Sequence, residues 1–287
     1  MKTIELETPK QTPALLQTTG ADAVIQSLKA EGVKTIFGYP GGAIMPIYDA
    51  LFDHLEEVNH VLTRHEQGAI HAAQGYARTS GKTGVVFATS GPGATNLITG
   101  LADALIDSTP LVCITGQVAS HLLGTDAFQE TDVMGISMPV TKWNCQVTKA
   151  EDIAPTLAKA FYIASSGRPG PVLVDITKDA QFEKLDFSYE KCTAVRSFQP
   201  KPKLNADQLQ AASKLLNEAK KPLMIVGQGI MLSNAEEELL VFAEKTGVPV
   251  ASTLLGLGAF PANHPQFVGM VGMHGNYAPN VKSNECD

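Results

Sequence analysis

The chain has little of what marks a nucleic-acid-binding or membrane protein. Lysine and arginine together number 22 against 29 aspartates and glutamates, which gives a formal net charge of −7. No basic stripe offsets this negative excess, so binding to nucleic acid or to an anionic membrane surface is not expected. No apolar run approaches the roughly 20 residues that span a bilayer, so no membrane partner is expected either.

Cysteine is also scarce, and its four residues form neither a CxxC pair nor a zinc-ligand spacing: Cys113, Cys145, Cys192 and Cys286. Cys113 lies in the apolar run 111–114 and is interpreted as a small buried side chain. His65 and His71 are six residues apart, a separation that does not place them on one helix face, so no metal site is predicted. This use of cysteine is typical of a reducing compartment, and we expect a cytoplasmic location.

The length of 287 residues leaves room for two domains. Residues 1–17 have neither a signal-peptide core nor the composition of a transit peptide, and we interpret them as a flexible leader. Residues 187–204 contain prolines and no clear periodicity, so we interpret them as a linker. The linker separates a first domain at 18–186 from a second domain at 205–287.

Short β-rich runs alternate with helical patterns in the first domain. Helices are predicted at 20–29, 44–54, 65–80, 94–106 and 153–165. Strands are predicted at 35–37, 59–62, 84–89, 111–115 and 172–176. This alternation predicts an α/β fold with a doubly wound parallel sheet.

The second domain begins with the same alternation but does not complete it. Helices are predicted at 207–219 and 234–246, and strands at 223–226 and 248–252. Only two clear strands precede residue 287, so an incomplete Rossmann-like domain is expected. The turn Gly227-Gln228-Gly229 has part of a GxGxxG fingerprint, but Leu232 stands where the third glycine would be, which makes the dinucleotide signal weak.

Two glycine-rich turns follow strands of the first domain: Gly38-Tyr39-Pro40-Gly41-Gly42 and Ser90-Gly91-Pro92-Gly93-Ala94-Thr95-Asn96. Gln117 follows a third strand. Ligands of open parallel sheets bind beyond the carboxyl ends of the strands, so these segments should converge. One such turn alone more often serves only to turn the chain, but three at one sheet edge favour a ligand site.

Glu66 opens a helix between these two turns in the sequence. A carboxylate at a helix start is usually favoured by the helix dipole and faces water. Flanked by two turns of bare backbone, it can instead reach a heterocyclic cofactor. Lys178, just past a strand, and Phe128, in an irregular segment, are more simply a solvated charge and a loop anchor.

The motifs together resemble those of acetolactate synthase (acetohydroxyacid synthase) catalytic subunits, of the thiamine-diphosphate enzyme family. The matching strings are FGYPGGA, RHEQGA, FATSGPGATN, ITGQV, GTDAFQE, GRPGPVLVDITKD and GMHGNYAPN. The resemblance implies a pyrimidine-binding domain at 18–186 and the first part of a central FAD-binding domain at 205–287. The family's Gly-Asp-Gly motif, which holds Mg²⁺ and the diphosphate, does not occur here. We therefore expect an N-terminal fragment that is inactive alone, with Mg²⁺ held by a missing C-terminal domain.

The resemblance also assigns residues. Glu66 corresponds to the glutamate that hydrogen-bonds the aminopyrimidine ring nitrogen of thiamine diphosphate and takes part in acid–base catalysis through the cofactor. Gln117, near the reacting centre, and Lys178, at the substrate channel, are implied as catalytic partners; Phe128 and Gln129 line that channel. The pyrimidine side is lined by Tyr39, Gly42, Thr89, Pro92 and Asn96. The implied FAD contacts are Arg168, Gly227, Gly229, Thr253, Leu254, Met273, His274 and Gly275.

The function implied is condensation of pyruvate with a second 2-oxo acid, pyruvate or 2-oxobutyrate, with loss of carbon dioxide, in the biosynthesis of isoleucine, valine and leucine. The implied partners are a second catalytic subunit, in a homodimer or homotetramer, and a small regulatory subunit. Ala119 and His121 stand where many relatives carry proline and arginine. This difference concerns channel contacts and inhibitor sensitivity.

Three alternatives remain open at this point. Two are other enzymes of the same cofactor family, pyruvate oxidase and the flavin-free catabolic acetolactate synthase. The GYPGG turn and the AFQE string favour the biosynthetic enzyme over both. Glyoxylate carboligase is disfavoured because its family lacks the glutamate that Glu66 supplies. The third alternative is a non-catalytic dinucleotide-binding module, in which Glu66 would have no role.

Overall fold

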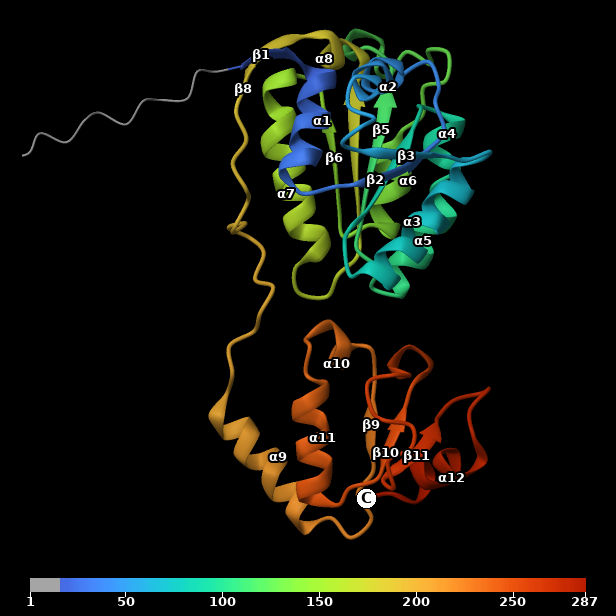
Figure 1. Cartoon of the computed structure of the whole chain (residues 1–287), viewed down its shortest axis with the longest axis vertical. Helices are drawn as coiled ribbons and strands as arrows, with labels where there is room; N and C mark the ends of the chain where they lie inside the picture. Colours follow the sequence, from blue (N-terminus) through green and yellow to red (C-terminus); the bar gives the residue numbers. More distant parts are fainter. Residues whose placement is uncertain (1–15) are drawn as a thin grey trace, which may run out of the picture. The chain divides into compact units, whose positions relative to one another are not determined.

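The computed structural model describes residues 16–287. The chain divides between Lys201 and Pro202 into two compact units, which we name unit 1 and unit 2 (Figure 1). The flexible leader was predicted at residues 1–17, and residues 1–15 of it lie outside the described part of the chain. Its last two residues belong to strand β1 (Leu16–Thr19), so the prediction is wrong there. Strand β1 pairs antiparallel with β8 (Lys184–Phe187), a distant partner that no local pattern reveals.

Unit 1 contains a six-stranded sheet in the order β3-β2-β4-β5-β7-β6, and its strands pair in parallel. Their bounds are β2 (Thr35–Gly38), β3 (Asn59–Leu62), β4 (Gly84–Ala88), β5 (Leu111–Gln117), β6 (Trp143–Val147) and β7 (Pro171–Thr177). Strands β4, β5 and β7 are buried along their whole length, as central strands covered on both faces must be. The predicted doubly wound parallel sheet is confirmed.

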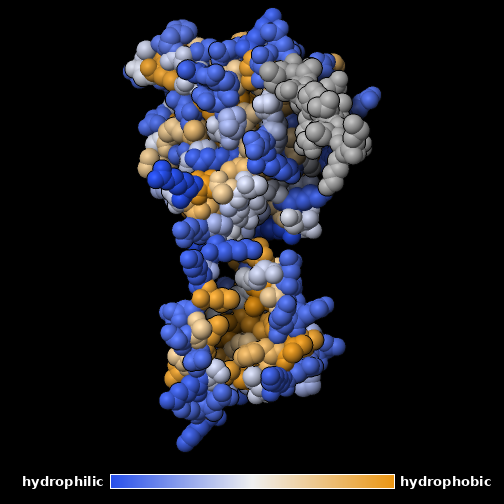
Figure 2. Space-filling view, turned by 90° about the vertical axis from the view of Figure 1, so that its left-hand side faces the viewer, coloured by the Kyte–Doolittle hydropathy of each residue, from blue (hydrophilic) through white to orange (hydrophobic). Residues whose placement is uncertain are grey.

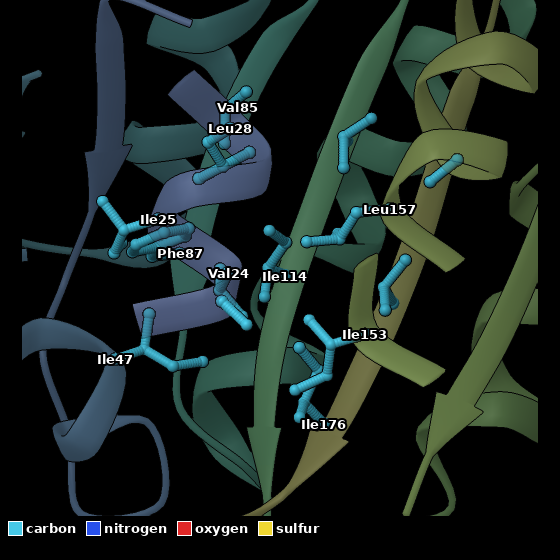
Figure 3. Close-up of a cluster of buried hydrophobic side chains, with 14 of the residues drawn as sticks. Val24, Ile25, Leu28, Ile47, Val85, Phe87, Ile114, Ile153, Leu157 and Ile176 are labelled. Atoms are coloured by element: carbon cyan, nitrogen blue, oxygen red, sulfur yellow. The ribbon is translucent and has the colours of Figure 1, made fainter. Parts of the chain in front are cut away.

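Helices cover both faces of this sheet (Figure 1). One layer holds α1 (Gly20–Ala30), α2 (Met45–Phe52) and α7 (Ile153–Ser165). The other holds α3 (Glu66–Ser80), α5 (Ile98–Ile106) and α6 (Val133–Ser137). Alternate strand residues supply the two cores: Phe87 and Ile114 pack with Val24 of α1 (Figure 3), whereas Val86 and Cys113 pack with Ile70 of α3.

Two predictions for unit 1 are corrected by the structure. The helix predicted at 94–106 is broken into α4 (Pro92–Thr95) and α5, because Asn96 ends the first turn. No helix or strand was predicted between residues 115 and 153, yet this stretch contains α6, the sheet strand β6 and three 3₁₀ turns, at Ser120–Leu122, Met138–Val140 and Ala150–Asp152. Strand β6 lies at the sheet edge and is only partly buried, and its sequence WNCQV alternates apolar and polar residues, a strand signal that the sequence analysis missed. A short helix, α8 (Lys178–Phe182), follows β7 directly.

Unit 2 is a parallel three-stranded sheet in the order β11-β10-β9. Its elements are α9 (Ala206–Glu218), β9 (Met224–Val226), α10 (Gly229–Leu232), α11 (Glu236–Thr246), β10 (Val250–Ser252), a 3₁₀ turn at Leu254–Gly256, β11 (Phe267–Met270) and α12 (Tyr277–Glu285). The expectation of only two strands is wrong. The third strand, β11, was missed because Gly269 interrupts its sequence pattern. In the structure this glycine adopts φ +105, and the pairing register with β10 shifts beside it.

The core of unit 2 is small, as expected for an incomplete Rossmann-like domain. Helix α9 buries none of its residues, and Leu209 and Leu215 on it are exposed. Apolar surface accordingly gathers on the face of unit 2 displayed in Figure 2. No helix within residues 16–287 is both long enough and apolar enough to cross a membrane.

Candidate functional site

The predicted pyrimidine-side turns of unit 1 converge on Thr89, at the carboxyl end of β4. The Thr89 hydroxyl accepts a 3.1 Å hydrogen bond from the backbone N–H of Ala43, in the turn after β2. A Cβ atom on Gly41 would lie 2.5 Å from the Thr89 side chain, and one on Gly93 would lie 2.7 Å from it. Both glycines are therefore required for the two turns to pack against the same threonine.

Glu66 lies in this cluster because of how α3 begins. His65 is the N-cap, with extended backbone, and its ring Nδ1 accepts a 3.1 Å hydrogen bond from the backbone N–H of Gln67. The carboxylate of the next residue, Glu66, is thereby placed at the positive end of the helix dipole. The Glu66 side chain is only 7% exposed, so it is not an ordinary solvated helix-start carboxylate.

The two oxygens of Glu66 have different surroundings. Oε2 accepts a 2.9 Å hydrogen bond from the Asn96 side-chain amide. Oε1 lies 3.3 Å from the position that a Cβ on Gly93 would occupy, so it faces bare backbone. Asn96 therefore fixes the carboxylate at Oε2, and no hydrogen bond from residues 16–287 reaches Oε1.

Tyr48 is a neighbour that the sequence did not indicate. Its hydroxyl lies 3.3 Å from His60 Nε2, and a Cβ on Gly38 would clash with it. Burial, and then the negative charge of Glu66, raise the pKa of the Tyr48 phenol. A tyrosine in an apolar helix gives no signal of this electrostatic link.

The residues expected at the substrate channel form a tight loop, residues 124–131, which we name the channel segment. The Glu130 carboxylate accepts hydrogen bonds from the backbone N–H groups of Gly124, Thr125 and Ala127, and these lower its pKa, the Gly124 bond most. Phe128 at the tip is 87% exposed. The structure therefore presents Phe128 to solvent on a loop organised around Glu130.

Gln129 connects the channel segment to the glycine turn after β4. Its backbone has φ +62, and its carbonyl oxygen lies 2.6 Å from where a Cβ on Gly91 would be. Gly91 itself has φ +59, a conformation that favours glycine. Of the predicted site residues, Glu66, Asn96, Thr89 and Gln129 are thus joined through this one turn.

Gln117, which was expected near the reacting centre, has a buried and fully hydrogen-bonded side chain. Its side chain is 1% exposed, and Nε2 donates to Asp175 Oδ2 at 3.1 Å and to the Thr131 carbonyl at 3.2 Å. Its Oε1 accepts from the backbone N–H of Val118 at 2.9 Å. The whole amide is used inside the protein in this structure.

Asp175 is a buried group that sequence reasoning passed over. It is 0% exposed, and desolvation raises its pKa, although hydrogen bonds from Thr115, Gln146 and Gln117 act in the opposite direction. A signal was present: a carboxylate stands in the otherwise apolar strand VLVDI. A charged residue in a fully buried strand pattern calls for a partner.

Lys178 is the first residue of α8, just beyond the end of β7, and is partly exposed. The next residue, Asp179, accepts hydrogen bonds from the backbone N–H of Ser120 at 3.0 Å and from its hydroxyl. Desolvation acts to raise the Asp179 pKa, but the hydrogen bonds outweigh it and lower the pKa to about 2. The segment with Ala119 and His121 is therefore anchored beside Lys178.

The remaining predicted pyrimidine contacts lie on the open side of the cluster. Tyr39 is 41% exposed, and Pro92 is exposed. A Cβ on Gly42 would meet no atom within 4 Å. A carboxylate held at one oxygen, with bare glycine backbone at the other, fits a heterocycle with a hydrogen-bonding ring nitrogen.

The predicted flavin-binding residues of unit 2 follow three neighbouring parallel strands. Gly227 and Gly229 follow β9, Thr253 and Leu254 follow β10, and Met273, His274 and Gly275 follow β11. The backbone N–H of Thr253 donates to the Val226 carbonyl at 2.9 Å, which holds the first two ends together. The buried Ser252 hydroxyl at this edge has no hydrogen-bond partner among residues 16–287, which fits a polar ligand there.

Arg168, the flavin contact expected from unit 1, is engaged within that unit. Its Nε donates to the Ser108 hydroxyl at 2.7 Å, and its Nη2 donates to the carbonyls of Ile106 and Leu105. These carbonyls end α5, so the guanidinium caps that helix.

Within residues 16–287 no group of three or more His, Cys, Asp or Glu side chains could hold a metal ion. A cavity of about 350 Å³ opens at the amino ends of strands β2 and β4, where its lining includes Lys34, Thr35 and Lys82. None of the predicted site residues lines this cavity.

Comparison with known proteins defines the class. Residues 18–136 match the model of the thiamine pyrophosphate enzyme N-terminal TPP binding domain, and residues 209–287 match that of the thiamine pyrophosphate enzyme central domain. The chain belongs to the thiamine pyrophosphate enzyme family, and the resemblance found in its motifs is confirmed.

The similar curated proteins are more specific. The chain is 54% identical to an acetolactate synthase large subunit of Corynebacterium glutamicum, over 90% of this chain and 41% of that protein. It is 51% identical to the acetolactate synthase large subunit of Haemophilus influenzae, over 94% and 47% of the two chains. It is 54% identical to an acetolactate synthase of Mycobacterium bovis, over 92% and 43%. The chain spans less than half the length of these relatives.

Proposed function

We propose that this chain forms the pyrimidine-binding domain and part of the FAD-binding domain of an acetolactate synthase catalytic subunit. The reaction is condensation of pyruvate with a second 2-oxo acid, pyruvate or 2-oxobutyrate, with loss of carbon dioxide, in branched-chain amino-acid biosynthesis. The observation that carries the proposal is the buried Glu66 carboxylate, held at Oε2 by Asn96 and facing bare backbone at Oε1. Support also comes from relatives named acetolactate synthase at 51–54% identity.

Thiamine diphosphate, when bound, supplies the carbanion-stabilising chemistry for decarboxylation and carbon–carbon bond formation. The part of this chain is to orient its pyrimidine and to hold a proton. Glu66 Oε1 is the atom that accepts or exchanges the proton, while Asn96 fixes the carboxylate plane. Gly93 keeps a side chain out of the space beside Oε1, because a Cβ there would lie 3.3 Å from that oxygen.

The substrate side is assigned to the channel segment and to Lys178. Lys178 offers a cation at the sheet edge beside the anchored Ser120, suited to the carboxylate of a 2-oxo acid. Phe128 and Gln129 would line the channel. The domain assignment follows the same reasoning: 18–186 binds the pyrimidine, 187–204 is a linker, and 205–287 belongs to the FAD-binding domain.

FAD is assigned to the converging strand ends of unit 2, where Ser252 has an unpartnered buried hydroxyl. Mg²⁺ and the diphosphate are assigned to a domain outside these 287 residues. A second catalytic subunit and a small regulatory subunit are the proposed partners, and the name "large subunit" of the relatives supports the latter. Four free cysteines are compatible with a cytoplasmic location.

The test uses a chimera in which residues 18–287 replace the matching segment of the Haemophilus influenzae relative. We expect acetolactate from pyruvate in the presence of thiamine diphosphate, Mg²⁺ and FAD. Glu66→Gln should lower kcat on the order of 10²–10⁴-fold, the usual scale for lost acid–base catalysis, with an unchanged circular dichroism spectrum. The matched control is Glu56→Gln, the same chemical change at an exposed position.

Two outcomes would contradict the proposal. A chimera with near-wild-type turnover after Glu66→Gln would remove the assigned role of this carboxylate. A folded chimera that binds FAD or a nucleotide but forms no acetolactate would favour the non-catalytic binding module.

A further inference from the structure

Four polar side chains, three of them buried and Gln146 partly buried, form a cluster across three neighbouring strands of unit 1. Asp175 of β7 lies in register with Thr115 of β5 on one side and with Gln146 of β6 on the other. Thr115 donates to Asp175 Oδ1 at 2.6 Å, and Gln146 donates to Oδ2 at 3.0 Å. Gln117, two residues beyond Thr115 and so on the same face of β5, adds the bond to Oδ2 at 3.1 Å.

A carboxylate at this position is costly. Burying it requires desolvation, and apolar residues of similar volume usually stabilise a sheet interior as well or better. The face concerned is the one covered by α6, where Cys113 and Leu173 of the same strands are packed in an apolar core. Sheet stability alone therefore gives no reason for Asp175.

The reason lies in the orientation of Gln117. Its Nε2 is shared between Asp175 Oδ2 and the carbonyl of Thr131, and its Oε1 accepts from Val118 N–H. A side-chain amide has one donor nitrogen and one acceptor oxygen. The Asp175 carboxylate can only accept, so it holds the Gln117 nitrogen on the side of Thr131. With that end fixed, the amide donates to Thr131, the last residue of the channel segment.

The connection continues to the cofactor side of the site. Within the channel segment, the Gln129 carbonyl packs on the bare backbone of Gly91. Gly91 opens the turn that carries Gly93 and Asn96, the two residues beside the Glu66 carboxylate. Asp175, Gln117, Thr131 and Gln129 thus form one line of contacts from the sheet interior to the glycine turn.

We propose that Asp175 is a positioning residue: its carboxylate orients the Gln117 amide, which holds the channel segment against the Gly91 turn. Gln117 then acts by positioning and not by contact with reacting atoms. The statement that the channel segment faces substrate rests on the proposed function. The statement that Asp175 holds this segment in place is independent of the proposed function.

The direct test is amide hydrogen exchange on this chain, comparing peptides of the channel segment with peptides of β4. Gln117→Leu and Asp175→Val should each speed exchange at Gly124, Ala127 and Glu130 on the order of tenfold, with β4 unchanged. The double variant should exchange no faster than either single variant, because both remove one link. If Asp175→Val does not fold, Asp175→Ser replaces it.

Two variants serve as controls. Gln146→Leu removes a hydrogen bond to the same Asp175 oxygen without touching Gln117, so channel-segment exchange should stay within about twofold of wild type. Asp175→Asn should rescue the segment, because its oxygen can accept from both glutamines while the Thr115 hydroxyl turns to accept from its amide. Equal acceleration throughout unit 1, additive effects in the double variant, or loss of protection with Gln146→Leu would each overturn the proposal.

A kinetic arm separates this proposal from the proposed function. In the chimera, Gln117→Leu should raise KM for pyruvate on the order of tenfold and lower kcat by less than about threefold, since positioning is lost and acid–base chemistry is kept. A fall in kcat with unchanged KM would return Gln117 to a catalytic role and overturn the inference. If exchange responds as expected but the chimera forms no acetolactate, positioning by Asp175 stands and the proposed function fails.

Discussion

The side-chain amide of Asn96 donates a 2.9 Å hydrogen bond to Oε2 of Glu66, joining two helices that start 26 residues apart in the sequence, at Glu66 and Pro92. The same residue ends α4. The break between α4 and α5 is therefore where the Glu66 carboxylate acquires its partner.

Asn96→Ala in the chimera should lower kcat on the order of tenfold, because Glu66 loses the bond that fixes its orientation. The matched control is Thr95→Ala, whose hydroxyl bonds only to the Pro92 carbonyl on the exposed side of the same turn. Steady-state acetolactate formation measures both. Equal effects of the two substitutions would show that the turn matters and the Asn96–Glu66 bond does not.

Gly93→Ala should impair the site more than Asn96→Ala does. Its Cβ would lie 2.7 Å from Thr89 Cγ2 and 3.3 Å from Glu66 Oε1, so it displaces the carboxylate or fills the space beside it. We expect weaker binding of thiamine diphosphate to the chimera, on the order of 10²-fold by titration, since a misplaced group costs that much. Gly68→Ala is the control, because its Cβ would meet nothing within 4 Å. Unchanged cofactor affinity in Gly93→Ala would place the pyrimidine elsewhere.

Two glycine substitutions in adjacent helices should change stability in opposite directions. In α3, a Cβ on Gly75 would meet nothing within 4 Å, so Gly75→Ala should raise the free energy of unfolding of unit 1 by about 0.5–1 kcal/mol. In α5, a Cβ on Gly100 would lie 2.2 Å from Ile70 Cγ2, so Gly100→Ala should lower it by about 1–3 kcal/mol. Urea denaturation of this chain measures both. Effects of the same sign would contradict the packing of α3 on α5.

Asp179→Asn should destabilise unit 1 in a pH-dependent way. Desolvation acts to raise the Asp179 pKa, but several hydrogen bonds, the side-chain bond from Ser120 foremost, outweigh it and lower the pKa from 3.8 to about 2. The ionised group therefore stabilises the fold above about pH 4, and this contribution is lost as pH falls from about 4 to about 2. We expect a loss on the order of 1 kcal/mol at pH 7 that disappears near pH 2, measured by urea denaturation. Asp186→Asn, at an exposed position of β8, is the control, and a pH-independent loss would show that charge is not involved.

The sequence by itself determined the elements whose signals are local. The strand-ending turns from Gly38 and Gly91, the helix that starts after His65 and stops at Gly81, and the apolar strands β4, β5 and β7 follow from turn chemistry, capping and continuous apolar runs. These local signals alone predicted the doubly wound sheet and the position of Glu66 at the start of a helix. The family motifs added which chemistry the converging turns would serve.

Tertiary structure decided the rest, because the deciding interactions join residues far apart in the chain. Strand β6 shows only a five-residue alternation and a glycine interrupts the apolar residues of β11, so pairing with β7 and β10 defines these strands. The helix break at Asn96 coincides with a hydrogen bond to Glu66, 30 residues away. Asp175 acquires a role only where strand order brings Gln117 and Gln146 to its carboxylate, and a lone charge in an apolar strand cannot show which donors will surround it.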